Sequence, residues 1–178
     1  MSGQWTKTVL RSVRLPKQLE EVLSKDAKAK GLSVNALVST ILTKYAEWDR
    51  FAEKFGFVTI TRTGFRAIHD ALDKDTLVKL AVELGSQNPR EMTLFWFKKL
   101  NFETFLSYLN LICRYGRVGE YELEMDGKNC TILLHHGLGF NVSHYIGHFL
   151  TEAVRAIVHV VPTTEVGRNS LVLKFERP

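Results

Sequence analysis

The chain has 178 residues, of which 45% are hydrophobic and 24% charged, a balance typical of globular proteins and unlike that of disordered or fibrous chains. No apolar run approaches the ~20 residues of a membrane-spanning helix, no signal-peptide pattern follows the first residue, and the two cysteines, Cys113 and Cys130, suggest no disulfide framework. We therefore expect a cytoplasmic protein without membrane association, with a formal net charge of +5.

The excess positive charge lies near the amino terminus. Residues 1–30 contain seven lysines and arginines against three carboxylates. A localised basic surface attracts nucleic-acid phosphates without regard to base sequence. A solvated surface with extra lysines would give the same count, so charge alone does not decide between these two interpretations.

Residues 8–16 are predicted to form a strand, which Pro16 ends because it cannot donate to a ladder. Side chains alternate between the two faces of a strand. One face carries the apolar residues Val9, Val13 and Leu15. The other carries Thr8, Leu10, Ser12 and Arg14.

Two helices are predicted to follow. The first helix is predicted over residues 17–30, where Leu19, Leu23 and Ala27 form one apolar stripe at four-residue spacing. Gly31 is suited to end this helix, because it readily adopts the left-handed conformation. Ser33 is a natural N-cap for the second helix, whose apolar residues repeat with a period of 3.6 at Val34, Leu37, Val38, Ile41, Leu42 and Tyr45. We expect this helix to continue to Gly56.

One strand and two short helices bury too little surface to fold alone, and a single strand leaves both edges unpaired. A two-fold dimer meets both requirements, because the strands pair antiparallel and the four helices share a core. The sequence therefore predicts a homodimer.

The order and spacing of Ser12-Val13-Arg14-Leu15-Pro16, the first apolar stripe, Gly31-Leu32-Ser33 and the second apolar helix resemble the ribbon-helix-helix family of MetJ-, Arc- and CopG-type repressors. The resemblance covers roughly residues 6–50. It implies an antiparallel two-stranded ribbon that enters the major groove of double-stranded DNA.

Carried onto this sequence, the resemblance implies that Leu10, Ser12 and Arg14 contact base edges. Arg14 is the strongest candidate, because a guanidinium can bond guanine O6 and N7 together. The start of the second helix, Ser33-Val34-Asn35, would offer backbone N–H groups to a phosphate. Lys7 and Lys17 would be flanking phosphate contacts.

Arg11 departs from the family pattern, since it stands where an inward apolar residue is usual. Either the ribbon frays near residues 10–11, or base contacts are confined to residues 12 and 14. Alternatively, Arg14 is an exposed arginine that only keeps an edge strand soluble.

Residues 1–54 are thus predicted to form the DNA-binding and dimerisation domain, and residues 55–178 a second domain. In the second domain the patterns predict a strand over 57–61, helices over 63–72, 74–84, 90–100 and 101–115, and a hairpin of strands 121–125 and 129–134 about Asp126-Gly127. A helix over 141–157 capped by Asn141 and a last strand over 171–175 complete it.

This order is a βαββαβ plan with an enlarged first helical crossover, which is the ferredoxin-like arrangement. The fold class predicted for the chain is therefore α+β. A ribbon-helix-helix head joined to such a domain is similar in layout to nickel-responsive regulators of the NikR type, and that likeness is architectural only.

Four histidines suggest a transition-metal site in the second domain. His144 and His148 lie four apart on a predicted helix, and His135 and His136 end the strand before it. These donors could converge at one strand–turn–helix corner. Helix-face histidines that only meet solvent are the commoner case, and that alternative stays open.

The sequence contains no GxxxxGK(S/T), no GxGxxG after a strand, no HExxH and no GxSxG motif, and we expect no enzyme. The sequence favours a transcriptional regulator that binds its operator as a dimer or as side-by-side dimers. Its second domain would sense a ligand or stabilise the assembly. The alternative is an antitoxin-like protein-interaction module with a DNA-binding head. The tail of such a module is usually a low-complexity or strongly charged segment, whereas residues 55–178 have the pattern of a folded domain.

Overall fold

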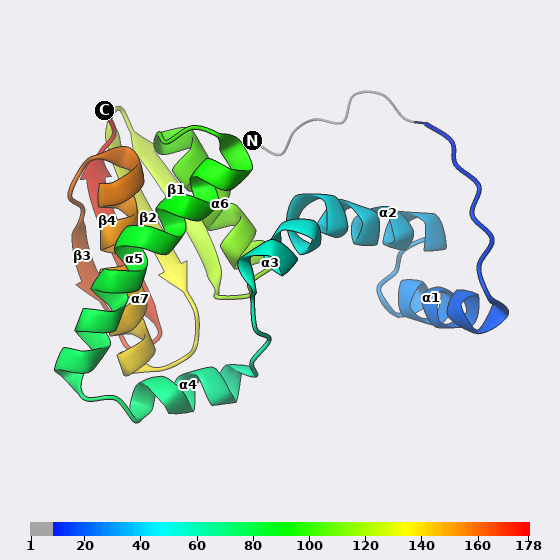
Figure 1. Cartoon of the computed structure of the whole chain (residues 1–178), viewed down its shortest axis with the longest axis horizontal. Coiled ribbons are helices and arrows are strands. Elements are labelled where there is room, and N and C mark those ends of the chain that lie inside the picture. The colour runs from blue at the N-terminus through cyan, green and yellow to red at the C-terminus, as the bar shows by residue number, and fades with distance from the viewer. Residues whose placement is uncertain (1–8) are drawn as a thin grey trace. The chain divides into compact units, whose positions relative to one another are not determined.

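The computed structural model describes residues 9–178, which divide into two compact units after Phe57 (Figure 1). The amino-terminal unit ends at Phe57, and the carboxyl-terminal unit comprises Val58–Pro178. The sequence placed this boundary after residue 54. No helix in the described part of the chain has the length and apolar character needed to cross a bilayer.

The amino-terminal unit consists of the helices that the sequence predicts. Helix α1 spans Lys17–Ala29 and α2 spans Val34–Lys44. The second helix continues through one π-helical stretch, η1 (Tyr45–Asp49), into α3 (Arg50–Phe55), and ends at Gly56 in the left-handed conformation. The predicted N-cap is confirmed, since the Ser33 hydroxyl accepts from the backbone N–H of Ala36 at 3.1 Å.

This unit has almost no core of its own. Within residues 9–57 the buried hydrophobic side chains are Ala27, Leu37 and Trp48. Many large apolar side chains stay exposed, namely Val9, Leu10, Val13, Leu15, Leu19, Val22, Leu32, Ile41, Leu42, Tyr45, Phe55 and Phe57. A single copy therefore buries too little apolar surface to stabilise this fold.

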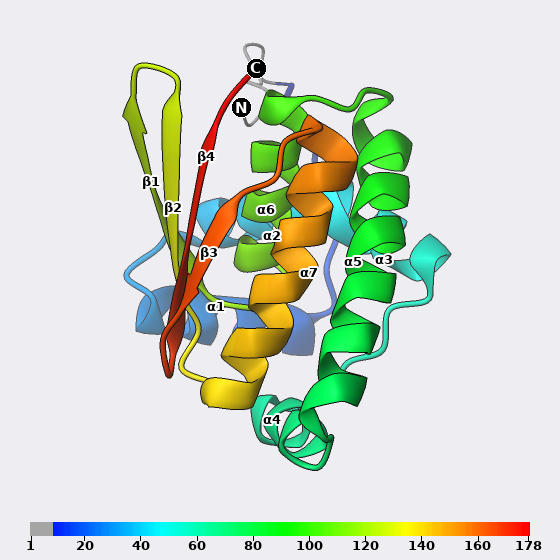
Figure 2. The same ribbon diagram turned by 90° about the vertical axis from the view of Figure 1, so that its left-hand side faces the viewer.

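The carboxyl-terminal unit is α+β, as predicted. Its elements are α4 (Arg62–Asp70), α5 (Lys74–Phe97), α6 (Phe102–Arg114), β1 (Glu120–Asp126), β2 (Asn129–His135), α7 (Phe140–Val158), β3 (Thr163–Val166) and β4 (Ser170–Glu176). The four strands form one antiparallel sheet in the order β1-β2-β4-β3. Figure 2 shows α6 and α7 on one face of this sheet, with α5 beyond α7.

The core lies between the sheet and α7. Alternate residues of the two central strands face it and are buried, namely Cys130, Ile132, Leu134, Leu171, Leu173 and Phe175. They pack with the apolar face of α7, which carries Val142, Ile146, Leu150, Val154 and Ile157. This period-two pattern on the strands and the helical period on α7 confirm the predicted hairpin, helix and last strand.

One predicted strand does not form and one strand was not predicted, so the βαββαβ order is not formed. Residues 57–61 form no strand and pair with none of the four strands of the sheet. Strand β3, which the sequence patterns did not predict, pairs with β4 at one edge of the sheet. The carboxyl-terminal unit thus runs through three helices, a hairpin, α7 and a second hairpin.

The predicted break between residues 84 and 90 is also wrong, since α5 continues through Pro89. Proline removes one helical hydrogen bond, which usually ends or kinks a helix. Here Gly85 and Pro89 are both buried. A Cβ at Gly85 would overlap the backbone of Phe149, so α5 and α7 pack closely along this face. This packing stabilises α5 through Pro89 against the loss of one hydrogen bond.

The predicted cap of α7 is displaced by two residues. The helix begins after Gly139, whose φ is 93°, and not after Asn141. The Asn169 side chain accepts from the Gly139 N–H at 3.0 Å, and the Asn169 carbonyl accepts from His136. These hydrogen bonds to Asn169 hold the turn before α7. Asn141 does not cap the helix, and its side-chain amide donates to the His69 carbonyl at 3.5 Å.

Candidate functional site

The predicted base-contacting residues lie in an exposed segment before α1. Leu10, Ser12 and Arg14 belong to residues 9–16, which are exposed and form no strand within one chain. The predicted ribbon pairs two chains, so it stays a prediction. Lys7, a predicted phosphate contact, lies outside the described residues. Lys17 begins α1 and stands 3.8 Å from Glu21, an exposed pair of little energetic weight.

The start of α2 has the groups that a phosphate contact requires. The hydroxyl of Ser33 accepts a hydrogen bond from the N–H of Ala36, and the backbone carbonyl of Ser33 accepts one from the N–H of Leu37. The backbone N–H groups of Val34 and Asn35 come before the first intrahelical bonds and so have no acceptor within α2. Together with the helix dipole, these two groups favour an anion at this end.

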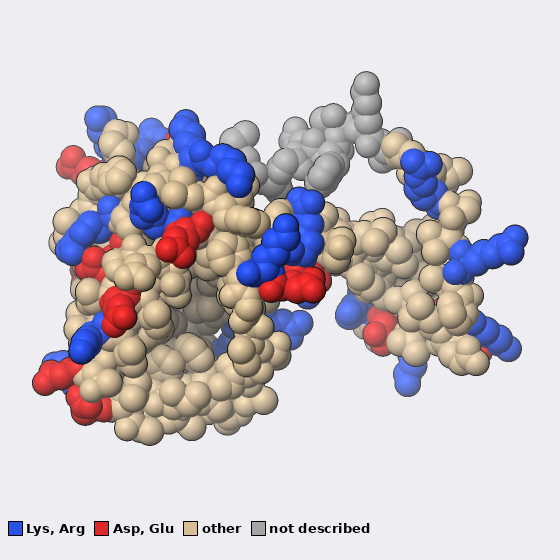
Figure 3. Space-filling model, viewed as in Figure 1, with Lys and Arg blue, Asp and Glu red and all other residues tan. Residues whose placement is uncertain are grey.

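The described basic side chains between residues 9 and 30 are exposed, and Figure 3 shows exposed basic side chains on the amino-terminal unit. They come from the segment before α1 and from α1 with its end, namely Arg11, Arg14, Lys17, Lys25, Lys28 and Lys30. A polyanion could reach them without a change in the fold.

The four predicted metal ligands do not converge. His135 and His136 are successive strand-end residues, so one side chain is exposed and the other buried. His144 and His148 lie on α7 with stacked rings whose centroids are 6.5 Å apart. Over residues 9–178, no group of three or more potential ligands is placed to hold a metal ion. The predicted four-histidine site is therefore not formed.

His136 has a different role, because both of its ring nitrogens are engaged. Nδ1 accepts from the backbone N–H of Leu138 at 3.0 Å, so Nε2 carries the proton and donates to Ser143 Oγ at 2.7 Å. Burial, followed by the charges of Arg62 and His135, lowers the pKa of this imidazole. His136 is thus a neutral group that fixes the turn before α7.

This neutral state predicts a pH dependence of stability. The unfolded chain binds a proton on His136 below its ordinary pKa of about 6.5, whereas the folded chain resists it. The free energy of unfolding should therefore be constant above that pH and fall as the pH drops below it. Urea titrations at pH 7.5 and 5.5 measure the difference.

The matched variant is His136→Gln, which keeps a side-chain acceptor but cannot be protonated. We expect it to be less stable at neutral pH by about 1–3 kcal/mol and to lose part of the acid sensitivity. We expect the remaining acid sensitivity to come from His144. Its pKa is also lowered, first by burial and then by the charges of Lys74 and His148. Equal acid sensitivity in the two proteins would show that His136 is not responsible.

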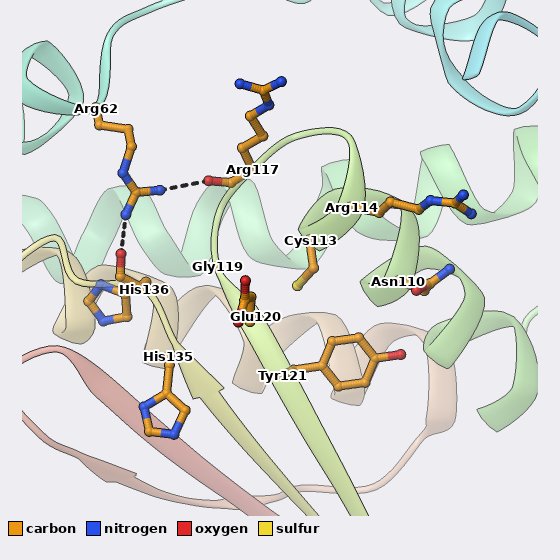
Figure 4. Close-up of a pocket in the computed structure, with 10 residues that line it drawn as sticks. All are labelled: Arg62, Asn110, Cys113, Arg114, Arg117, Gly119, Glu120, Tyr121, His135 and His136. Atoms are coloured by element: carbon orange, nitrogen blue, oxygen red, sulfur yellow. Dashed lines mark hydrogen bonds between the residues drawn. The ribbon is translucent and has the colours of Figure 1, made fainter. Parts of the chain in front are cut away.

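A pocket of about 610 Å³ opens beside His136, where four segments meet. Its lining comes from the start of α4, the end of α6, the loop before β1 with the start of that strand, and the end of β2. The lining residues are Arg62, Asn110, Cys113, Arg114, Arg117, Gly119, Glu120, Tyr121, His135 and His136 (Figure 4). Only the two histidines among them were predicted as site residues from the sequence, because the other residues form no local motif.

Arg62 joins two walls of this pocket. Its guanidinium donates to the carbonyl of Arg117 at 2.9 Å and to the carbonyl of His136 (Figure 4). Arg117 has a φ of 54°, in the left-handed region, and the bond from Arg62 holds its carbonyl in place. One fixed arginine thus ties the loop before β1 to the turn before α7.

Gly119 permits the close approach of the same two segments. A Cβ at this position would overlap the carbonyl oxygen of His135 and lie 3.1 Å from the Cα of His136. Both neighbours are backbone atoms that cannot rotate away. We therefore expect Gly119→Ala to lower the free energy of unfolding by about 3 kcal/mol in urea titrations.

The control is Gly127→Ala at the opposite end of the hairpin. Gly127 has a φ of 57°, and a methyl group added there would meet no atom within 4 Å, so only backbone strain of about 1 kcal/mol is expected. Equal losses in the two variants would mean that the contact with His135 does not matter.

The pocket's cysteine is not an activated nucleophile. Burial raises the pKa of the Cys113 thiol to about 12, and burial also raises the pKa of Tyr121. A thiol in this state stays protonated and unreactive at neutral pH. Both side chains therefore contribute neutral surface to the pocket wall.

No protein-family model matches the chain, and no curated protein matches its sequence.

Proposed function

We propose that this protein is a sequence-specific transcriptional regulator that binds double-stranded DNA as a homodimer. In this proposal the segments before α1 of two copies pair as a ribbon in the major groove, and Arg14 contacts base edges there. Such dimers could also bind side by side on a longer operator. The carboxyl-terminal unit would sense a ligand or stabilise the assembly.

The observation that carries this proposal is the uncovered apolar surface of the amino-terminal unit. Val9 and Val13, on one predicted strand face, are 71% and 77% exposed in the single chain. On α2, Ile41 and Leu42 are 48% and 61% exposed. An apolar surface of this extent favours a second copy, and a pair of copies supplies the neighbour that the strand lacks.

The geometry around this surface supports DNA as the ligand of the dimer. The basic side chains lie on the same unit, and the N–H groups of Val34 and Asn35 are available for a phosphate. The antitoxin-like alternative is less well supported. Its tail would wrap around a toxin, whereas residues 58–178 have a core of their own.

The test is selection of bound duplexes from a random pool with the purified full-length chain, at two salt concentrations, together with light scattering to give the mass. Enrichment of one sequence by a dimer is expected. A monomer, or binding that falls with salt and enriches no sequence, would contradict the proposal.

A further inference from the structure

The pocket beside His136 has the size of a small-molecule site. Its volume of about 610 Å³ lies within the usual range for such sites, roughly 300–1,000 Å³. All of its lining residues belong to the carboxyl-terminal unit. Figure 4 shows Arg62 and His136 at one end, Arg114 and Asn110 at the other, and Cys113, Glu120 and Tyr121 between them. The cavity can therefore hold a compact molecule in contact with both ends.

The charge of the lining is mainly positive. The lining contains three arginines, Arg62, Arg114 and Arg117, and one carboxylate, that of Glu120. Neither Arg62 nor Arg117 forms an ion pair with a carboxylate of residues 9–178. Arg62 uses two of its five N–H groups on backbone carbonyls, which fixes its charge without neutralising it. This is the electrostatic character of a site for an anion.

The remaining walls are suited to the body of an organic molecule. The thiol of Cys113 stays protonated, and the ring of Tyr121 is partly buried beside it. The amide of Asn110 and the imidazole of His135 can form directed hydrogen bonds. An apolar wall with a few polar groups is typical of pockets that bind small ligands in one orientation.

We infer that this pocket binds a small molecule bearing an oxyanion, a carboxylate or a phosphate, which its arginines hold while Cys113 and Tyr121 contact its body. As an effector site, the pocket rests on the proposed function, because only a DNA-binding protein could transmit such binding to an operator. As a binding site it is independent of DNA.

The first experiment compares benzoate, its neutral isostere benzamide, and inorganic phosphate in NMR titrations of the full-length protein. Benzoate is expected to give saturable shifts at the amides of Gly119, Glu120 and Tyr121, and to bind about tenfold or more tightly than benzamide. Phosphate binding as tight as that of benzoate would identify a phosphate ligand, and weaker binding a carboxylate. No saturable shift with benzoate or phosphate up to about 10 mM would overturn the inference.

The second experiment changes the charge of the lining. The double variant Arg114→Gln/Arg117→Gln keeps the hydrogen bonds from Arg62 to the backbone carbonyls and should weaken benzoate binding by about tenfold or more. Glu120→Gln should strengthen it, whereas Arg90→Gln/Arg177→Gln, which removes two exposed charges outside the pocket, should not change it. Equal losses in both double variants would mean binding by net charge alone and would overturn the site.

The third measurement separates the site from the proposed function. Affinity for the selected duplex is measured with and without saturating benzoate. Benzoate binding with unchanged DNA affinity would overturn the effector role and leave the binding site. Benzoate binding by a protein that selects no DNA sequence would overturn the proposed function alone.

Discussion

If the protein is the homodimer that we propose, replacement of Ile41 by lysine is expected to dissociate it and to unfold the amino-terminal unit. Ile41 lies on the apolar face of α2 and is 48% exposed in the single chain. Full burial of such a side chain contributes about 1.5–3 kcal/mol, of which about half would be gained in the dimer, and the two-fold axis repeats the change in each protomer. A buried, unpaired ammonium adds to this cost. The dimer dissociation constant should therefore rise by at least about a hundredfold.

Sedimentation velocity measures the dissociation, and circular dichroism measures the accompanying loss of helix. The matched control is Ser39→Lys, which places the same charge at an exposed position of α2 away from the apolar face. This control should remain dimeric. The carboxyl-terminal unit should keep its own thermal transition in both variants, because its core is separate. A dimeric Ile41→Lys protein would show that two copies do not associate through this face.

Replacement of Arg14 by alanine is expected to abolish the preference for the selected duplex and to leave nonspecific binding in place. A bidentate arginine–guanine contact contributes about 1–3 kcal/mol of discrimination between bases, whereas phosphate contacts contribute affinity for any sequence. The measurement is the ratio of dissociation constants for the selected and a scrambled duplex at two salt concentrations. That ratio should fall about five- to hundredfold.

The control for this prediction is Arg11→Ala. Arg11 is an exposed arginine in the same segment, but it lies on the opposite predicted strand face. Its loss should weaken binding to both duplexes alike and lower the salt dependence. If Arg11→Ala changes the ratio and Arg14→Ala does not, the assignment of the two strand faces is reversed. If neither changes it, the segment does not contact bases.

Much of the amino-terminal unit could be predicted because its signals are local. Gly31 has the left-handed φ of 66° expected of a residue that ends a helix, and Ser33 caps the next one. The apolar period predicted α2, and Gly56 marked the end of its continuation through η1 and α3. The candidate DNA-contacting residues could be named from sequence only as what the resemblance to the ribbon-helix-helix family implies for Leu10, Ser12, Arg14 and the start of the helix after Ser33.

The pocket could not be predicted, because it depends on which segments meet. Arg62 and Glu120 are far apart in sequence and share no motif. His135 and His136 were singled out as metal ligands, but the fold buries only the second and uses both of its nitrogens in hydrogen bonds. Spacing along a chain gives the residues that could converge, whereas burial and hydrogen-bond partners decide whether they do.

The sequence by itself thus determined the positions of most helix ends, the tight hairpin around Gly127, and the apolar residues of the amino-terminal unit that the single chain leaves exposed. These depend on the backbone preferences of single residues and on periodicity. Only the tertiary structure decided that α5 continues through Pro89, where close packing against α7 outweighs a lost hydrogen bond, and that residues 57–61, without a neighbouring strand, stay outside the sheet. A strand or an interrupted helix is stabilised by its neighbours, and those are set by the fold as a whole.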